Sequence, residues 1–309
     1  MRGAIRQVQG IAGLLFILLA GGAAVAQAGD PHGANAEIVV TGDRDRDRSV
    51  RDFVRGITVE SDAQIARFAA PVCPASFGLP APVNAFVAGR IRQTARGAGI
   101  PVAARPCRPN IVVLVAERGE EVLAAIRRRR PALLAGLDLS EMRRLRGMAG
   151  PVRSWQIVEQ RGGDGREMEH ISFIQFGNGP PVYIGPARRL ATAVASRLEQ
   201  PVRQDLTLSV VIFDLDALDG MTLAQIADHA AMRTLVRTDP DVAPSGRTIL
   251  ALFSDQLSGA PPAGALTGLD AAYLRAVYAT DNRISGSRQR ANIARILSRE
   301  PAEAGAAAQ

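Results

Sequence analysis

The spacing of apolar residues predicts a mixture of strands and helices. Two continuous apolar runs of strand length, residues 110–116 and 206–213, are typical of strands buried on both faces. Helical spacing predicts a helix over Ala81–Gly97, ended by the glycines at 97 and 99. Further helices are predicted over residues 120–130, 140–147, 186–199, 222–237, 266–279 and 288–299. Because these elements do not follow a strict βαβ rhythm, they favour an α+β fold, a mixed sheet with flanking helices.

The remaining segments set the predicted domain limits. Residues 50–68 are expected to hold a strand and a turn, residues 154–176 a hairpin around the glycine-rich turn RGGDGR, and residues 248–253 a short apolar segment. Thr222 is a plausible N-cap. We therefore predict one domain over residues 49–300, with a possible subdivision near residue 150, and a disordered alanine-rich tail over residues 301–309.

The first 28 residues have the layout of a secretory signal peptide. Arg2 and Arg6 precede the apolar run of residues 11–20, and Ala28 ends a small-residue cleavage site. Cleavage is expected before Gly29, which gives a periplasmic or secreted protein that is not an integral membrane protein. The alternative is an uncleaved anchor, because the apolar stretch approaches spanning length.

The chain has two cysteines, Cys73 and Cys107. An exported protein meets an oxidising environment, which favours a disulfide between them. Closing a loop of about 35 residues is worth roughly 3–4 kcal/mol in the chain-entropy model. Two buried free thiols are the alternative, and a metal site lacks the further cysteines it requires.

Composition excludes several classes of chemistry. The chain of 309 residues carries a formal charge of +7, yet all of its basic side chains are arginine. Without lysine, neither a phosphate-binding loop of the G-x-x-x-x-G-K-[ST] type nor Schiff-base chemistry is available. The S-x-x-K acyl-transfer motif is excluded for the same reason. No cofactor is expected.

The acidic turn over residues 213–222, FDLDALDGMT, is one candidate site. Asp214, Asp216, Asp219 and Gly220 resemble a calcium loop, but the spacing is broken by one residue and the twelfth position is not glutamate. No metal site is therefore predicted. The turn also fits a strand end followed by acidic residues near a helix N-terminus.

The three histidines do not form a zinc motif. His32 lies near the N-terminus, His170 lies in the predicted hairpin, and His229 follows Asp228 in a predicted helix. The chain contains no H-E-x-x-H and no G-x-S-x-G sequence. The candidates for catalysis are then four side chains outside any such motif: Asp214, Asp219, Asp228 and His229.

A run of four arginines lies close to three more. Such clusters bind phosphate, anionic lipid or acidic glycan, although solvated helix faces give the same pattern. Nucleic acid is not an expected partner of an exported protein. The arginines are Arg127, Arg128, Arg129, Arg130, Arg143, Arg144 and Arg146.

Residues 29–48 are predicted to form a flexible arm around one short apolar strand. That strand, EIVVTG, resembles the TonB box of TonB-dependent outer-membrane receptors, which adds as a strand to its energising partner. The resemblance implies docking to a TonB-like periplasmic domain, while the rest of the chain is too short for such a receptor. The residues of the segment are Glu37, Ile38, Val39, Val40, Thr41 and Gly42.

A broader resemblance covers residues 50–299. The segments QIARFAAPVCPASFGLP, CRPNIVVLV, LTLSVVIFDLDALDGMTLAQIADHAAMRTLVRTDP and LTGLDAAYLRAVYATDN are similar to uncharacterised exported alphaproteobacterial proteins, sphingomonad-like in character. Their order is also similar to a domain of unknown function with zincin-like traits, whose metal helix would fall on residues 222–235. Gln225, Asp228 and His229 stand there without an H-E pair. The resemblance thus implies a degenerate zincin-like scaffold without its activity.

Together these features predict an exported, non-catalytic binding or envelope-associated protein. One alternative is a hydrolase with its site between Asp214 and His229. Another is a binder of an anionic envelope component through the arginines of residues 127–146.

Overall fold

The computed structural model describes residues 41–61, 63–175, 177–189, 199–239, 248–254 and 262–299. The signal-peptide segment, the first four residues of the EIVVTG segment, His32 and residues 301–309 lie outside this part. The described elements form a four-stranded mixed sheet with helices on both faces and a separate two-stranded sheet, so the predicted α+β class is confirmed.

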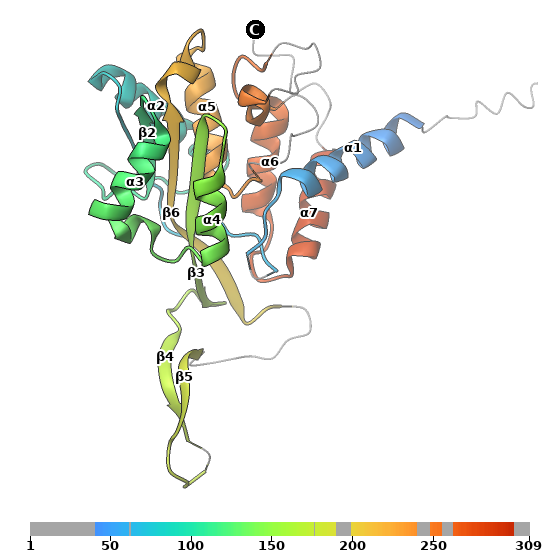
Figure 1. Ribbon diagram of the computed structural model, residues 1–309. Coiled ribbons are helices and arrows are strands. Elements are labelled where there is room, and N and C mark those ends of the chain that lie inside the picture. Colours follow the sequence, from blue (N-terminus) through green and yellow to red (C-terminus); the bar gives the residue numbers. More distant parts are fainter. Residues whose placement is uncertain are drawn as a thin grey trace, which may run out of the picture. The chain divides into compact units, whose positions relative to one another are not determined.

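Four strands make the main sheet, in the order β1 (Pro74–Phe77), β2 (Ile111–Ala116), β6 (Val202–Asp214) and β3 (Val152–Gly162) (Figure 1). The first three strands run parallel, and β3 is antiparallel to β6. The predicted strands over residues 110–116 and 206–213 are confirmed as β2 and β6. Because β6 pairs with strands from both sides of residue 150, the sheet crosses that position.

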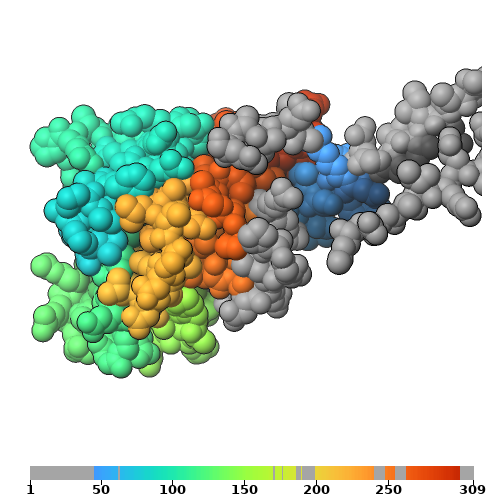
Figure 2. Space-filling model, turned by 90° about the horizontal axis from the view of Figure 1, so that it is seen from above, coloured from blue at the N-terminus to red at the C-terminus, as the bar shows by residue number. Residues whose placement is uncertain are grey.

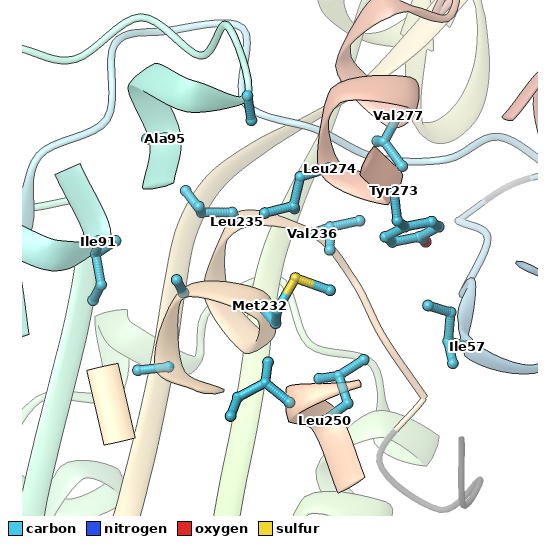
Figure 3. Close-up of a cluster of buried hydrophobic side chains, with 14 of the residues drawn as sticks. Ile57, Ile91, Ala95, Met232, Leu235, Val236, Leu250, Tyr273, Leu274 and Val277 are labelled. Carbon is cyan, nitrogen blue, oxygen red and sulfur yellow. The ribbon is translucent and has the colours of Figure 1, made fainter. Parts of the chain in front are cut away.

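One face of the sheet carries the larger core. The helices α2 (Ala81–Gly97), α5 (Leu223–Leu235) and α6 (Gly268–Ala279) pack there, and α5 lies between the other two when the molecule is seen from above (Figure 2). The helices α7 (Gly286–Arg299) and α1 (Thr41–Ile57) continue this layer. Figure 3 shows side chains from α1, α2, α5 and α6 meeting in the core, among them Ile57, Ile91, Met232 and Tyr273.

The opposite face carries a smaller core under α3 (Gly119–Arg129), a 3₁₀ turn at Pro131–Leu134 and α4 (Leu139–Gly147). Leu123 and Leu145 of these helices pack with Trp155 of β3 and Ile212 of β6. The strands are therefore covered on both faces, which accounts for the continuous apolar runs of β2 and β6.

Local sequence signals set several helix ends. Thr222 caps α5, as predicted, and forms a capping box with Gln225. The same device begins α4 at Asp138 and α6 at Thr267. The helix predicted over Ala81–Gly97 is confirmed with those bounds.

The predicted arm and first strand are wrong where the structure describes them. Residues 41–57 form helix α1, so Thr41 and Gly42 begin a helix and do not end a strand. Val50, Phe53, Val54 and Ile57 follow helical spacing; the last three are buried in the core and Val50 packs against it partly buried. The alternating charges before them suit a helix as well, because they set opposite charges three residues apart.

The hairpin predicted over residues 154–176 is also wrong. Its first half is β3, which pairs with β6, and its second half is β4 (Glu169–Ile174), which pairs with β5 (Val182–Arg189) in a separate two-stranded sheet. Consequently the helix predicted from residue 186 is wrong over its first four residues, which end β5; residues 190–198 lie outside the described part.

Candidate functional site

Asp214 lies at the end of β6 and joins the sheet to α3. Its Oδ1 accepts a hydrogen bond of 2.6 Å from the backbone N–H of Gly119, in the first turn of that helix. Nη1 of Arg153 lies 3.4 Å from both carboxylate oxygens. A carboxylate suits a helix N-terminus, so the fold itself accounts for this side chain.

Asp219 and Asp216 belong to the exposed turn that follows β6. Both side chains lie on the surface, whereas the Asp214 carboxylate is directed to Gly119 and Arg153. Within the described residues, no three histidine, cysteine, aspartate or glutamate side chains group closely enough to hold a metal ion.

Asp228 is a buried carboxylate of α5 with a complete set of partners. Arg90 of α2 donates from Nε and Nη2, both at 2.8 Å, and the backbone N–H of Leu266 donates at 2.7 Å. The bidentate geometry is the strong form of this pair. Asp228 thus links three segments of the core and has no open side toward a ligand.

His229, one residue further along α5, faces a different part of the core. Its Nδ1–H donates to the carbonyl of Ile249 at 3.0 Å, which leaves Nε2 to accept from Nε of Arg233 at 3.4 Å. The rings of Phe213 and Phe253 pack edge-on against the imidazole. Burial, followed by the positive charge of Arg233, lowers the pKa of His229 to about 3. The imidazole is therefore neutral and structural at physiological pH.

The stability of the protein is expected to fall as His229 is forced to ionise. The unfolded chain binds a proton at His229 below its ordinary pKa of about 6.5, but the folded chain does so only near the lowered pKa. Stability from this residue is therefore complete above the ordinary pKa of about 6.5 and is lost progressively as the pH falls from there toward 3. From about pH 8 to about pH 5 the loss is about 2 kcal/mol.

Urea unfolding at a series of pH values measures this loss. His229→Gln keeps a hydrogen-bonding side chain without a titrating group, so the difference between the two proteins should grow smaller as the pH falls. A difference that stays constant with pH would contradict a neutral, buried His229.

The seven arginines of the predicted cluster lie on the outer surface of α3 and α4. All are exposed, and four of them stand at the C-terminal end of α3, where positive charge is favourable. In the described part of the chain, the side chains of six have neither an ion pair nor a hydrogen bond. These six are Arg127, Arg128, Arg129, Arg130, Arg143 and Arg146. Their guanidinium groups are therefore free to meet an anionic partner.

The sequence analysis did not predict a charged patch that lies on β3 and β6. Where β3 and β6 extend beyond the start of β2, Arg161 pairs with Glu159 at 2.7 Å and Arg203 with Asp205 at 2.9 Å. The register sets like charges opposite one another, so the ion pairs run along each strand. Two shallow grooves of about 370 and 360 Å³ flank Arg161. Charged residues at alternate positions of two strands were the available signal.

The two-stranded sheet exposes a second surface that sequence reasoning missed. Phe173 of β4 and Tyr183 of β5 pack edge-to-face, with ring centroids 5.3 Å apart, yet both side chains remain more than half exposed. Val182 and Ile184 are exposed beside them. Phe173 falls in the predicted hairpin of residues 154–176, whereas no element is predicted over residues 182–184. The exposure of these side chains depends on what the two-stranded sheet packs against.

Cys73 and Cys107 form a disulfide, as predicted. Cys73 directly precedes β1, and Cys107 lies three residues before Asn110, next to the start of β2. The bond thus ties the beginnings of two neighbouring parallel strands. No helix among the described residues is long and apolar enough to cross a membrane.

Comparisons with known protein families, with curated proteins and with solved structures found no match to this chain.

Proposed function

We propose that this protein is an exported, non-catalytic binding protein that associates with phosphate-bearing surfaces of the cell envelope through the arginines of α3 and α4. The observation that carries the proposal is the group of six exposed guanidinium groups on one helical layer, which have no partners among the described residues. Arginine is suited to this role, because its planar group binds phosphate oxygens in pairs and keeps its charge at any working pH.

The neighbouring acidic residues support a basic surface at this place. Glu141 of α4 is paired with Arg237, and Asp138 is used as the helix cap. Glu121 of α3 pairs with Arg118 at the opposite end of that helix from the arginine run. Glu120 also lies in the first turn of α3, at the end opposite the arginine run. Among the described residues, these carboxylates therefore leave the arginine run uncompensated.

The hydrolase alternative has no observation in its favour. Asp214, Asp228 and His229 use their hydrogen-bonding atoms within the fold, each with different partners. The exported location rests on the signal-peptide pattern, and the disulfide is consistent with it.

Binding to vesicles tests the proposal. The full mature chain should sediment with vesicles that contain phosphatidylglycerol, but not with vesicles of phosphatidylcholine alone, and rising salt should release it. An arginine near an anionic surface contributes about 1 kcal/mol, so the double variant Arg128→Gln, Arg129→Gln should bind about 30-fold more weakly.

The matched control removes the same charge elsewhere. Arg51 and Arg55 are exposed on α1 and, like Arg128 and Arg129, have no ion pair in the described residues. Arg51→Gln, Arg55→Gln should leave vesicle binding nearly unchanged. Equal losses in the two double variants would show that net charge alone drives binding, and absence of binding by the wild-type protein would refute the proposed function.

A further inference from the structure

The guanidinium group of Arg92, on α2, lies against the disulfide. Its Nη2 is 3.2 Å from Sγ of Cys107 and 3.9 Å from Sγ of Cys73. Arg92 is 7% exposed, and its Nη1 donates to the carbonyl of Ala103 at 2.8 Å. A buried arginine therefore directs one of its nitrogens at two sulfur atoms.

Arg92 has no negative partner in the described part of the chain. Among the described residues, no carboxylate pairs with it, and its Nε is buried without a hydrogen-bond acceptor. The sequence between Cys73 and Cys107 contains several arginines but not one aspartate or glutamate. Burial, and then the positive charges of Arg105 and Arg96, lower the pKa of Arg92. A buried cation without a counter-charge is costly, so the oxidised protein leaves a charge uncompensated beside the disulfide.

Reduction would supply the missing charge. A thiolate is the reactive form of cysteine, and nearby arginine lowers the pKa of a thiol. A thiolate at Cys107 or Cys73 would lie within ion-pair distance of Arg92 in the geometry already present. The surroundings of the disulfide thus favour its reduced form more than a neutral environment would.

The backbone holds Cys73 beside Asn110, three residues after Cys107, independently of the disulfide. The N–H of Cys73 donates to Oδ1 of Asn110 at 2.7 Å, and its carbonyl accepts from the N–H of Asn110 at 3.2 Å. β1 pairs with β2 immediately afterwards, with Pro74 opposite Ile111. We therefore expect the two sulfur atoms and Arg92 to stay together when the disulfide is opened.

We propose that the Cys73–Cys107 disulfide is a thiol–disulfide exchange site, in which Arg92 holds the departing sulfur as a thiolate. The partner is a thiol pair, either one dithiol or two monothiols. A partner thiolate attacks Sγ of Cys107, which is partly exposed, whereas Cys73 is buried. The bond between the two cysteines breaks, and the sulfur of Cys73 leaves with the electron pair toward Arg92.

The second partner thiol completes the exchange. It attacks the partner sulfur of the mixed disulfide. Cys107, whose sulfur lies nearer to Arg92, is released, and the two partner thiols end as a disulfide. Two electrons pass from the partner to the protein. Of the two partner protons, one is taken by the cysteine that is not held as a thiolate, and the other goes to water.

Equilibration with reduced and oxidised glutathione tests the proposal on the full mature chain, with trapped thiols counted by mass. Structural disulfides resist reduction by glutathione. If the proposal is right, the Cys73–Cys107 disulfide should instead be measurably reduced at glutathione ratios that leave structural disulfides oxidised. At a pH well above the thiol pKa of both proteins, the equilibrium of Arg92→Met should lie about tenfold further toward the disulfide, as expected if Arg92 lowers a thiol pKa by about one unit; nearer neutral pH the difference should shrink.

Two further variants separate the contact from general charge. Arg92→Lys keeps a cation beside the sulfur atoms and should restore most of the wild-type equilibrium. Arg96→Gln removes an exposed charge one turn away and should change it by less than about twofold. The alkylation rate of the reduced protein against pH should give a thiol pKa below the ordinary value of about 8.5 in the wild-type protein, but not in Arg92→Met.

Three results would overturn the inference. They are a wild-type disulfide that glutathione does not reduce, thiols of ordinary pKa, and a reduced protein that has lost its circular dichroism spectrum. Retention of wild-type vesicle binding by Arg92→Met would show that the two proposals are independent.

Discussion

Replacing Tyr273 with alanine is expected to lower the free energy of unfolding by about 3–5 kcal/mol. The side chain is completely buried on α6 and meets Phe53 of α1 edge-on, with ring centroids 5.9 Å apart. Its hydroxyl and that of Thr58 lie 2.8 Å apart and are hydrogen bonded. The substitution leaves a cavity between α6 and α1 and deprives Thr58 of its partner. Urea unfolding followed by circular dichroism measures the loss.

Tyr273→Phe is the matched control, because it keeps the ring and removes only the hydroxyl. Its expected cost is about 1 kcal/mol, the net value of one hydrogen bond. If the alanine variant were no less stable than the phenylalanine variant, the ring would not be packed, and the docking of α1 on the core would be wrong.

Asp228→Ala is expected to cost about 3 kcal/mol. Removing one partner of a buried ion pair leaves the other charge uncompensated, which costs about 3–5 kcal/mol. The lower end applies here, because the Arg90 side chain is 31% exposed and water can solvate part of its charge. The backbone N–H of Leu266 also loses its acceptor. Chemical denaturation at neutral pH measures the effect.

Asp219→Ala provides the comparison. This side chain is exposed, so its removal should change stability by no more than about 0.5 kcal/mol. The contrast tests the structural role assigned to Asp228. A loss at Asp228 as small as that at Asp219 would mean that the carboxylate is not bound within the core, and it would again be a candidate for chemistry.

The elements that the sequence predicted best are those specified by near neighbours. The helix Ala81–Gly97 follows from its apolar stripe and the glycine after it, and the cap at Thr222 follows from the glutamine three residues later. In both cases the interactions that determine the bounds span only a few residues, so the sequence alone predicts these bounds.

Helix α1 was missed because two signals competed. The short apolar stretches within RDFVRGITVE suggested a strand, whereas Val50, Phe53, Val54 and Ile57 are spaced for a helix. Whether this segment forms a helix or a strand depends on the surface against which its apolar side chains can be buried. That surface is provided by α6 and α7, more than 200 residues later in the chain.

The candidate sites show the same limit. Asp228 and His229 are adjacent in α5, so the sequence grouped them, but a helix turns neighbouring side chains toward different surroundings. One contacts Arg90 and the other Phe213. The contact between Arg92 and the disulfide was equally hidden, because the folding of the loop between the cysteines, and not its residue types, places the guanidinium beside the sulfur atoms.

The order of the strands has a consequence for biogenesis. β2 finds its partner β6 about a hundred residues further along, with Ile111 opposite Ser209, and β3 also pairs with β6. Until residue 214 has been synthesised, both strands have open edges that invite wrong pairing. Nascent chains shortened before β6 should therefore depend heavily on chaperones, and folding should be slow, since its central strand arrives last.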